Sequence, residues 1–149
     1  MNYKRILFLL IISLIFATHA LADKTILAGG CFWCMESDYQ EQKGVTEVVS
    51  GFIGGTLENP TYSGNHQGHF EAVKVSYDPA VISYQQLLDL FWVNIDPFDN
   101  KGQFCDKGFS YRSAIFVQGA GEQQLAEQSL TAVAQRFPEE KVYTEIRDA

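Results

Sequence analysis

Runs of apolar residues alternate with polar, turn-rich stretches along the chain, and their spacing separates strands from helices. Three runs are rich in β-branched or aromatic residues and are bounded by turn residues, which predicts strands over 45–53, 70–77 and 112–118. A short apolar run at 25–28 and a last one at 141–146 predict further strands. The strand pattern therefore extends over most of the chain.

Helical spacing of apolar residues lies between these strands. Ser83 suits a helix N-cap, and the residues after it place apolar side chains on one face as far as Ile95. A second amphipathic stretch covers 122–137, and a polar, helix-like run over 35–42 ends before Gly44. We expect a helix in each of these places.

The order of these elements is β-α-β-β-α-β followed by α-β. The first six match the split βαβ, ferredoxin-like arrangement. We therefore expect an α+β fold, a two-layer sandwich with a βαββαβ core plus an extra helix and strand. Two long loops, over 56–68 and 96–110, interrupt this pattern. Loops of that length in a compact domain are often functional.

The beginning of the chain has a different character. Two basic residues precede an apolar run at 6–16 that is too short to span a bilayer well, and residues 20–22 have the A-x-A form of a cleavage site. We interpret residues 1–22 as a secretory signal peptide, with an uncleaved membrane anchor as the alternative. Residues 23–149 then form a single exported domain, periplasmic or secreted.

The charge balance narrows the range of partners. The chain of 149 residues has a net charge of −7, and loss of Lys4 and Arg5 with the signal would leave −9. An acidic domain disfavours nucleic acid and anionic membranes as partners. We expect no nucleic-acid partner, no membrane partner after signal cleavage, and a monomer.

A sequence with the features of a reactive site, Gly-Gly-Cys-Phe-Trp-Cys at 29–34, joins the first strand to the first helix. The glycines allow a sharp turn. Cys31 falls at the helix start, where unpaired N–H groups and the helix dipole favour a thiolate. Cys34 follows three residues later on the same helical face. Cys31 is thus the best nucleophile candidate, although a buried CxxC with two core aromatics would give the same pattern.

The cysteine count leaves other classes open. Three cysteines is an odd number, which in an exported protein indicates a reactive thiol. A CxxC pair is also typical of thiol–disulfide oxidoreductases. A non-catalytic metal-binding module is a third possibility, in which Cys105, His66 or His69 would join Cys31 and Cys34, although these spacings fit no regular zinc pattern.

Several polar residues suit a supporting role. Glu71 begins a strand between apolar residues, and an inward-facing Glu71 would have a raised pKa and act as a proton donor. The pattern alone favours a solvent-facing Glu71. Tyr62 and Tyr111 offer phenolic hydrogen bonds, and Asp106 follows Cys105 in the second long loop, where it suits a cap or an oriented water.

Five short blocks occur in a fixed order along the chain. They are Gly-Cys-Phe-Trp at 30–33, Asn-Pro-Thr-Tyr at 59–62, Gly-His-Phe-Glu-Ala-Val at 68–73, Tyr-Asp-Pro at 77–79 and Tyr-Arg-Ser-Ala at 111–114. Together they resemble the class A peptide-methionine sulfoxide reductases, from about Thr25 to Ile146. The first and third blocks form a pair far more specific than a lone CxxC.

The resemblance implies reduction of methionine S-sulfoxide, free or in proteins, in repair of oxidative damage. It makes Cys31 the nucleophile and Glu71 the acid, because a sulfoxide oxygen leaves poorly unless it is protonated. It therefore overrides the solvent-facing interpretation of Glu71. The further site residues that it implies are Phe32 and Trp33 for the substrate's methyl group, Tyr62 and Tyr111 for its oxygen, and Asp106 as the loop aspartate.

The resemblance also implies a redox cycle without a metal or an organic cofactor. Cys31 becomes a sulfenic acid, a second thiol condenses with it to a disulfide, and a thioredoxin-like dithiol restores the enzyme. Cys34 and Cys105 are both candidates for the resolving cysteine, and helical spacing favours Cys34. The chain stops at Ala149, short of the segment with which such reductases continue, so a truncated C-terminus is expected.

Overall fold

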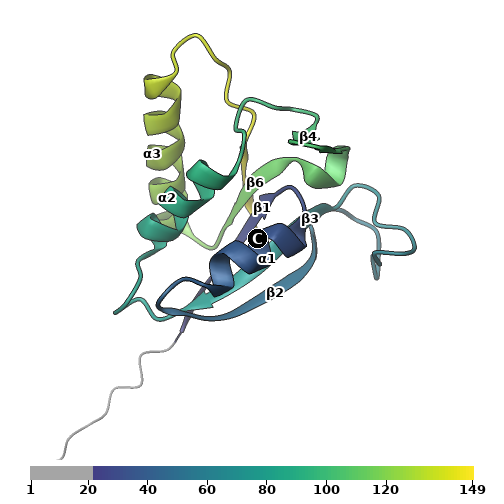
Figure 1. Ribbon diagram of the computed structural model, residues 1–149, viewed down its shortest axis with the longest axis horizontal. Coiled ribbons are helices and arrows are strands. Elements are labelled where there is room, and N and C mark those ends of the chain that lie inside the picture. The colour runs from purple at the N-terminus through teal and green to yellow at the C-terminus, as the bar shows by residue number, and fades with distance from the viewer. Residues whose placement is uncertain (1–21) are drawn as a thin grey trace, which may run out of the picture.

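The computed structural model describes residues 22–149 (Figure 1). The expected signal peptide over 1–22 lies, except for its last residue, outside the described part of the chain and stays a prediction. Within residues 22–149, every helix is too short or too polar to cross a membrane.

The elements follow the expected order. They are β1 (Asp23–Gly29), α1 (Phe32–Gln40), β2 (Val45–Ile53), β3 (Phe70–Tyr77), α2 (Tyr84–Asn94), β4 (Gly102–Gln103), β5 (Asp106–Lys107), the 3-10 turn η1 (Phe109–Tyr111), β6 (Ser113–Val117), α3 (Ala120–Arg136) and β7 (Glu145–Asp148). The second long loop contains the small β4–β5 hairpin and η1, which the sequence pattern does not predict. The last strand begins at Glu145 rather than at residue 141.

One five-stranded sheet has the order β2-β3-β1-β6-β7. Neighbouring strands are antiparallel except for β6 and β7, which are parallel. The first four strands have the ferredoxin-like order, and α3 is the crossover that a parallel neighbour requires. The expected fold, a βαββαβ core with an extra helix and strand, is confirmed.

The main core lies between the sheet and the helices (Figure 1). Helix α1 packs on β2 and β3, whereas α2 packs on β1 and on α3. The core side chains with no exposed surface include Leu27, Val73, Val75, Leu87, Leu88, Phe91 and Ile115. Phe70 and Phe116 belong to a smaller cluster with three buried alanines, so the centre of the sheet has two apolar environments.

Local sequence signals explain where α2 starts and where the chain turns into β2. Ser83 forms a capping box with Gln86: its hydroxyl accepts from the Gln86 N–H at 3.2 Å, and the Gln86 side chain accepts from the Ser83 N–H at 2.9 Å. Gly44 has φ +100° between α1 and β2, a conformation that other residues rarely adopt. Both residues fall where the sequence indicates an element boundary.

Buried side chains fix the two long loops. His69 is 6% exposed, and its ring nitrogens lie 3.0 Å from the Leu57 carbonyl and 3.4 Å from the Gly55 N–H. Gln103 is 2% exposed and makes two hydrogen bonds to the backbone of Asp96, one to its N–H at 2.6 Å and one to its carbonyl at 2.9 Å. Each side chain replaces the regular backbone pairing that a loop lacks.

Candidate active site

Cys31 lies where β1 passes into α1. Gly30 turns the chain with φ +95°, and a Cβ on it would come within 2.8 Å of the Gln103 side chain. Cys31 is the N-cap of α1, and its carbonyl accepts from the N–H groups of Cys34 at 3.1 Å and Met35 at 3.2 Å. The half-buried thiol therefore stands at the helix N-terminus, as the sequence predicts.

Glu71 on β3 faces inward beside that helix start. It is 1% exposed, and its Oε2 accepts from the Phe32 N–H at 3.2 Å. Its Oε1 is buried and has no hydrogen-bond partner within residues 22–149. The pattern-based expectation of a solvent-facing Glu71 is wrong, because both faces of β3 are covered except at Lys74.

The environment of Glu71 favours its protonated form. Burial raises the pKa of Glu71, with a smaller contribution from Asp106, whereas the Phe32 N–H and His66 oppose the rise. Burial disfavours the charged form of any carboxyl group. The free Oε1 is therefore positioned to donate a proton to a ligand.

An open cluster of aromatic rings surrounds the residue after Cys31. The Phe32 ring lies 5.1 Å from Trp33, 6.0 Å from Tyr62 and 5.5 Å from Phe52, and the Trp33 and Tyr62 rings are 4.8 Å apart. Phe32 is buried, whereas Trp33 and Tyr62 are each 54% exposed. This cluster offers an apolar, solvent-accessible surface that suits a small methyl-bearing group.

The cluster contains two residues that sequence reasoning did not place there. Phe52 lies opposite Glu71 in the β2–β3 pairing, and His66 stacks on its ring at 4.8 Å. The His66 Nδ1 lies 3.2 Å from the Thr61 carbonyl. The alternation along β2 places Phe52 on the helix side, but no sequence signal brings His66 to it.

Tyr111 completes the group from η1. Burial raises the pKa of Tyr111, and the charges of Glu71, Tyr62, Asp106 and Cys31 raise it further. The η1 turn packs on β3, the strand that carries Glu71. Cys31, Glu71 and Tyr62 thus come together around Phe32, and Tyr111 lies on the turn that packs against the Glu71 strand.

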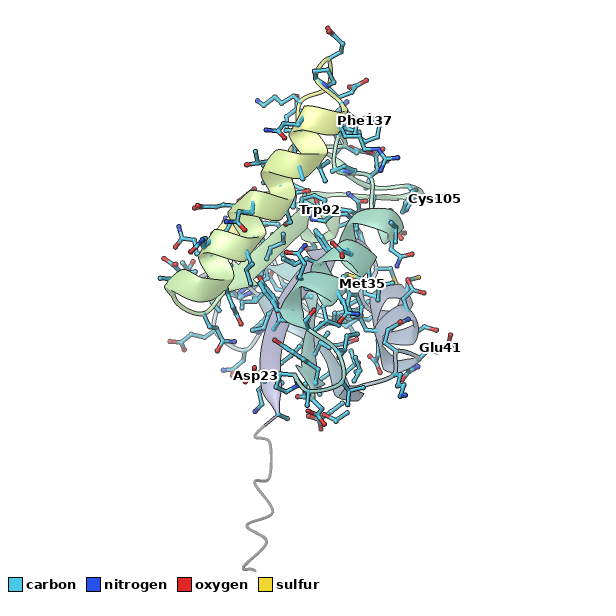
Figure 2. The ribbon with its side chains drawn as sticks, turned by 90° about the vertical axis from the view of Figure 1, so that its left-hand side faces the viewer. Asp23, Met35, Glu41, Trp92, Cys105 and Phe137 are labelled. Atoms are coloured by element: carbon cyan, nitrogen blue, oxygen red, sulfur yellow. The ribbon has the colours of Figure 1, made fainter. Side chains whose placement is uncertain are left out.

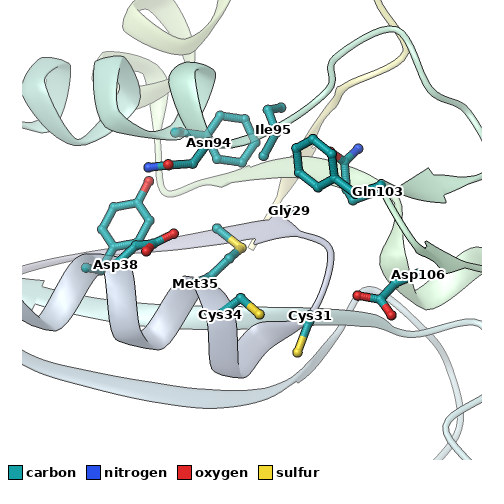
Figure 3. A pocket seen from close by; sticks show the side chains of 12 residues that line it. Gly29, Cys31, Cys34, Met35, Asp38, Asn94, Ile95, Gln103 and Asp106 are labelled. Carbon is teal, nitrogen blue, oxygen red and sulfur yellow. The ribbon is translucent and has the colours of Figure 1, made fainter.

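Cys31 and Cys34 line a cavity of about 170 Å³, the thiol pocket, between α1, the end of α2 and the β4–β5 hairpin (Figure 3). Its other lining residues are Gly29, Met35, Asp38, Tyr39, Phe91, Asn94, Ile95, Gln103, Phe104 and Asp106. A side-chain hydrogen bond with Cys31 raises the pKa of Cys34, and burial and the Cys31, Asp106 and Asp38 charges add to it. Both residues of the CxxC pair thus face the same cavity from the start of α1.

Cys105 lies apart from this pair. It is an exposed free thiol at the turn between β4 and β5, and it does not line the thiol pocket. Within residues 22–149, no three His, Cys, Asp or Glu side chains are grouped so that they could hold a metal ion. His69 is committed to loop backbone. The arrangement does not support the alternative of a metal-binding module.

Fold and site together define an α+β protein with a cysteine-based redox centre. The family model described as "Peptide methionine sulfoxide reductase" matches residues 23–149, and the chain belongs to that family. It is 48% identical over 130 residues to the peptide methionine sulfoxide reductase MsrA 2 of Caulobacter vibrioides, which covers 85% of this chain and 66% of that protein. The chain thus spans about two thirds of that relative's length.

Solved structures share the fold. The methionine sulfoxide reductase A of Corynebacterium diphtheriae superposes with a TM-score of 0.75 at 29% identity, over 85% of this chain and 64% of that one. Mxr1 of Saccharomyces cerevisiae, solved in complex with Trx2, superposes with a TM-score of 0.65 at 20% identity, over 91% of this chain and 82% of that one. The second similarity concerns the fold alone.

Proposed function

We propose that this domain reduces methionine S-sulfoxide, free or in proteins, to methionine. The observation that carries the proposal is the Glu71 Oε1, a buried carboxyl oxygen without a hydrogen-bond partner within residues 22–149. The other oxygen of the same carboxyl group, Oε2, accepts a hydrogen bond from the backbone N–H of Phe32, next to Cys31. A buried polar atom without a partner costs free energy, roughly 1–3 kcal/mol. Such an atom beside a thiol at a helix start suits an enzyme whose substrate presents an oxygen acceptor.

In this mechanism each group has one task. The substrate's methyl group lies against Trp33 and Phe32, while its oxygen accepts hydrogen bonds from Glu71 and Tyr111. The Cys31 thiolate attacks the substrate sulfur as Glu71 protonates the oxygen. The sulfur–oxygen bond of the substrate breaks, the oxygen passes to Cys31 as a sulfenic acid, and two electrons pass to the substrate, which leaves as methionine.

We infer that Cys34 is the resolving cysteine. Its side chain lies on the first turn of α1, the helix whose N-cap is Cys31, and both residues line the thiol pocket. Attack of the Cys34 sulfur on the sulfenic sulfur forms the Cys31–Cys34 disulfide and releases the oxygen as water. Cys105 remains the alternative, since it lies on the hairpin next to Asp106.

A dithiol is the chemical class of reductant that this disulfide requires. A small dithiol or a thioredoxin-like protein returns both sulfurs to thiols and takes up the oxidation as its own disulfide. No metal and no organic cofactor takes part in this sequence of steps.

A location outside the cytoplasm follows from the interpretation of residues 1–22, and mass measurement of the mature chain from cell fractions tests it.

The test uses residues 23–149 with dithiothreitol and the two epimers of methionine sulfoxide in separate assays. We expect methionine from the S epimer and none from the R epimer. Reduction of insulin disulfides without reduction of either epimer would instead identify a CxxC disulfide oxidoreductase, and the proposal would be wrong.

A further inference from the structure

Of the two cysteines that form the disulfide of the proposed cycle, Cys34 is the more accessible. Cys34 is exposed, whereas Cys31 is half-buried. No ring of the aromatic cluster lines the thiol pocket, whereas Cys31 does, so the cluster and the pocket are distinct features that meet at Cys31. Cys34 lines the pocket formed with the end of α2 and the β4–β5 hairpin (Figure 3).

Thiol chemistry supports attack at Cys34. In thiol–disulfide exchange, the sulfur of lower thiol pKa leaves faster. In the reduced protein, a side-chain hydrogen bond with Cys31 is the largest cause that raises the pKa of Cys34. Burial and the nearby charges of Asp106 and Asp38 also raise it, and they remain once the disulfide has formed, so Cys34 is a poor leaving group. Attack on Cys34 breaks the disulfide with Cys31 leaving as a thiolate, which restores the nucleophile directly.

The thiol pocket borders a second, apolar hollow. Ile95 and Phe104 line both, and the second has a volume of about 430 Å³ between the end of α2, the loop after it and α3. Trp92 and Phe137, labelled in Figure 2, also line it. We call this hollow, formed by Trp92, Val93, Phe98, Phe104, Val133 and Phe137, the α2–α3 groove.

Exposed apolar side chains concentrate at the α2–α3 groove. Val93 is 78% exposed, Phe104 66% and Phe137 43%. Apolar surface gathered in this way is typical of a protein-binding site. A small dithiol has no need of such a surface, because it diffuses to Cys34 directly.

Phe104 links the α2–α3 groove to the disulfide. It has φ +46°, a left-handed conformation that is costly for an aromatic residue. Its ring is largely exposed, so packing within the domain does not offset that cost. Strained residues cluster at functional sites. The hairpin holds this ring at the boundary between the α2–α3 groove and the thiol pocket.

We propose that the α2–α3 groove is the docking surface for the protein dithiol that reduces the Cys31–Cys34 disulfide. The partner is a thioredoxin-like protein with apolar surface around its reactive thiol and a basic side chain beside it, since Asp38 and Asp106 line the pocket. This proposal rests on the proposed function.

The exchange balances in two steps. The partner's first thiolate attacks the Cys34 sulfur and forms a mixed disulfide, while Cys31 leaves as a thiolate. The partner's second thiolate then attacks its own first sulfur and releases Cys34. Two electrons pass to the enzyme, and the partner leaves as a disulfide.

The experiment measures how fast a reduced bacterial thioredoxin reduces enzyme that already carries the Cys31–Cys34 disulfide, so no sulfoxide turnover is needed. The variants are Val93→Ser, Phe137→Ser and their combination. The matched control is Val81→Ser, an exposed valine before the start of α2, whereas the α2–α3 groove lies at the end of that helix. We expect the second-order rate constant to fall about tenfold or more in the double variant, because it removes one aliphatic and one aromatic side chain from the contact. Val81→Ser should react like the parent.

A parallel assay with dithiothreitol separates the two proposals. With dithiothreitol as reductant, the double variant should reduce methionine sulfoxide at the parent's rate. If the parent itself does not reduce methionine sulfoxide in this assay, only the proposed function is contradicted. A parent-like thioredoxin rate in the double variant overturns the docking surface. The docking surface is also overturned if the double variant has a raised KM for a sulfoxide peptide with dithiothreitol, because the α2–α3 groove would then bind the substrate chain. It is overturned as well if the parent is a dimer and the double variant is a monomer, because the groove would then bind a second copy.

Discussion

Glu71 uses its two carboxyl oxygens for different purposes. Oε2 accepts from the Phe32 N–H, which holds the side chain in place, and Oε1 is free of partners within residues 22–149. Because burial raises the pKa of Glu71, the carboxyl group retains its proton at a higher pH than an exposed glutamate does. The same residue therefore supplies both a fixed position and a mobile proton.

Replacing Glu71 by Gln tests that proton. Glutamine keeps a neutral donor but cannot release a proton, so kcat should fall by about a hundredfold or more. Because the acid form is the active one, the parent's kcat should also fall as pH rises through the raised pKa of Glu71. Steady-state rates against pH should lack this falling limb in Glu71→Gln, and a parent-like rate in that variant contradicts the role of the acid.

The same shift has a consequence for stability. The folded-state pKa of Glu71 lies above its unfolded value, so the folded protein binds more protons in the interval between the two. The contribution of Glu71 to stability is therefore complete below the unfolded pKa and is lost as pH rises through the folded one. Urea unfolding of the parent and Glu71→Gln across that interval should show the difference.

Cys34 has a role that a single turnover isolates. Cys34→Ser should still release one equivalent of methionine, because the Cys31 attack does not need it, and should then stop as a sulfenic acid. Cys31→Ser should release none while its circular dichroism stays that of the parent. A disulfide that forms at the parent's rate in Cys34→Ser, mapped to Cys105 by mass spectrometry, would make Cys105 the resolving thiol.

At the scale of elements, the junction between β1 and α1 depends on Gly30. This residue has φ +95° and lies against Gln103, the side chain that ties the β4 strand to Asp96. The nucleophile and the hairpin that carries Asp106 are therefore positioned by one contact. A change at Gly30 disturbs both sides of the thiol pocket.

A matched pair of glycine substitutions separates strain from this contact. Gly119→Ala, at φ +87° with nothing within 4 Å of the added Cβ, should lose about 1 kcal/mol of stability and keep its kcat. Gly30→Ala adds the clash with Gln103 and should lose more, with a lower kcat. Denaturant unfolding and turnover measure the two effects, and equal losses would show that the contact is unimportant.

The sequence predicts the elements better than it predicts their neighbours. Strands over 45–53 and 70–77 coincide with β2 and β3, since long β-branched runs carry a strong signal. The β4–β5 hairpin escapes prediction because two-residue strands have no period to detect. The last strand begins four residues late, at Glu145, and parallel pairing with β6 decides where it starts.

The candidate site shows the same limit. The family resemblance of its motifs predicts Cys31 and Glu71 as site residues, and the structure places these two residues close together. The inward orientation of Glu71 could not be predicted from the alternation of apolar and polar residues, because that alternation marks strands with one exposed face. His66 reaches Phe52 only through the path of the long loop, and Gln103 gains its role from Asp96, so neither contact is visible in a linear pattern.

For the molecule as a whole, the free Glu71 oxygen predicts stabilisation by substrate. A bound sulfoxide satisfies Oε1 only in the folded state, so it should raise the melting temperature as its concentration exceeds its Kd. Thermal scans of Cys31→Ser, which does not turn over, should show a rise with the S epimer. The R epimer and the Glu71→Leu variant are the controls, and a rise in either of them contradicts this origin.

The separation of the aromatic cluster from the thiol pocket has a kinetic consequence. In a ping-pong reaction at one shared surface, released product obstructs the second reactant, whereas two surfaces allow both to be occupied at once. Methionine should therefore inhibit competitively against the sulfoxide and non-competitively against the protein reductant. The disulfide can then be reduced before methionine has left the enzyme. Accumulated methionine would not slow this reduction by competing for the reductant's surface.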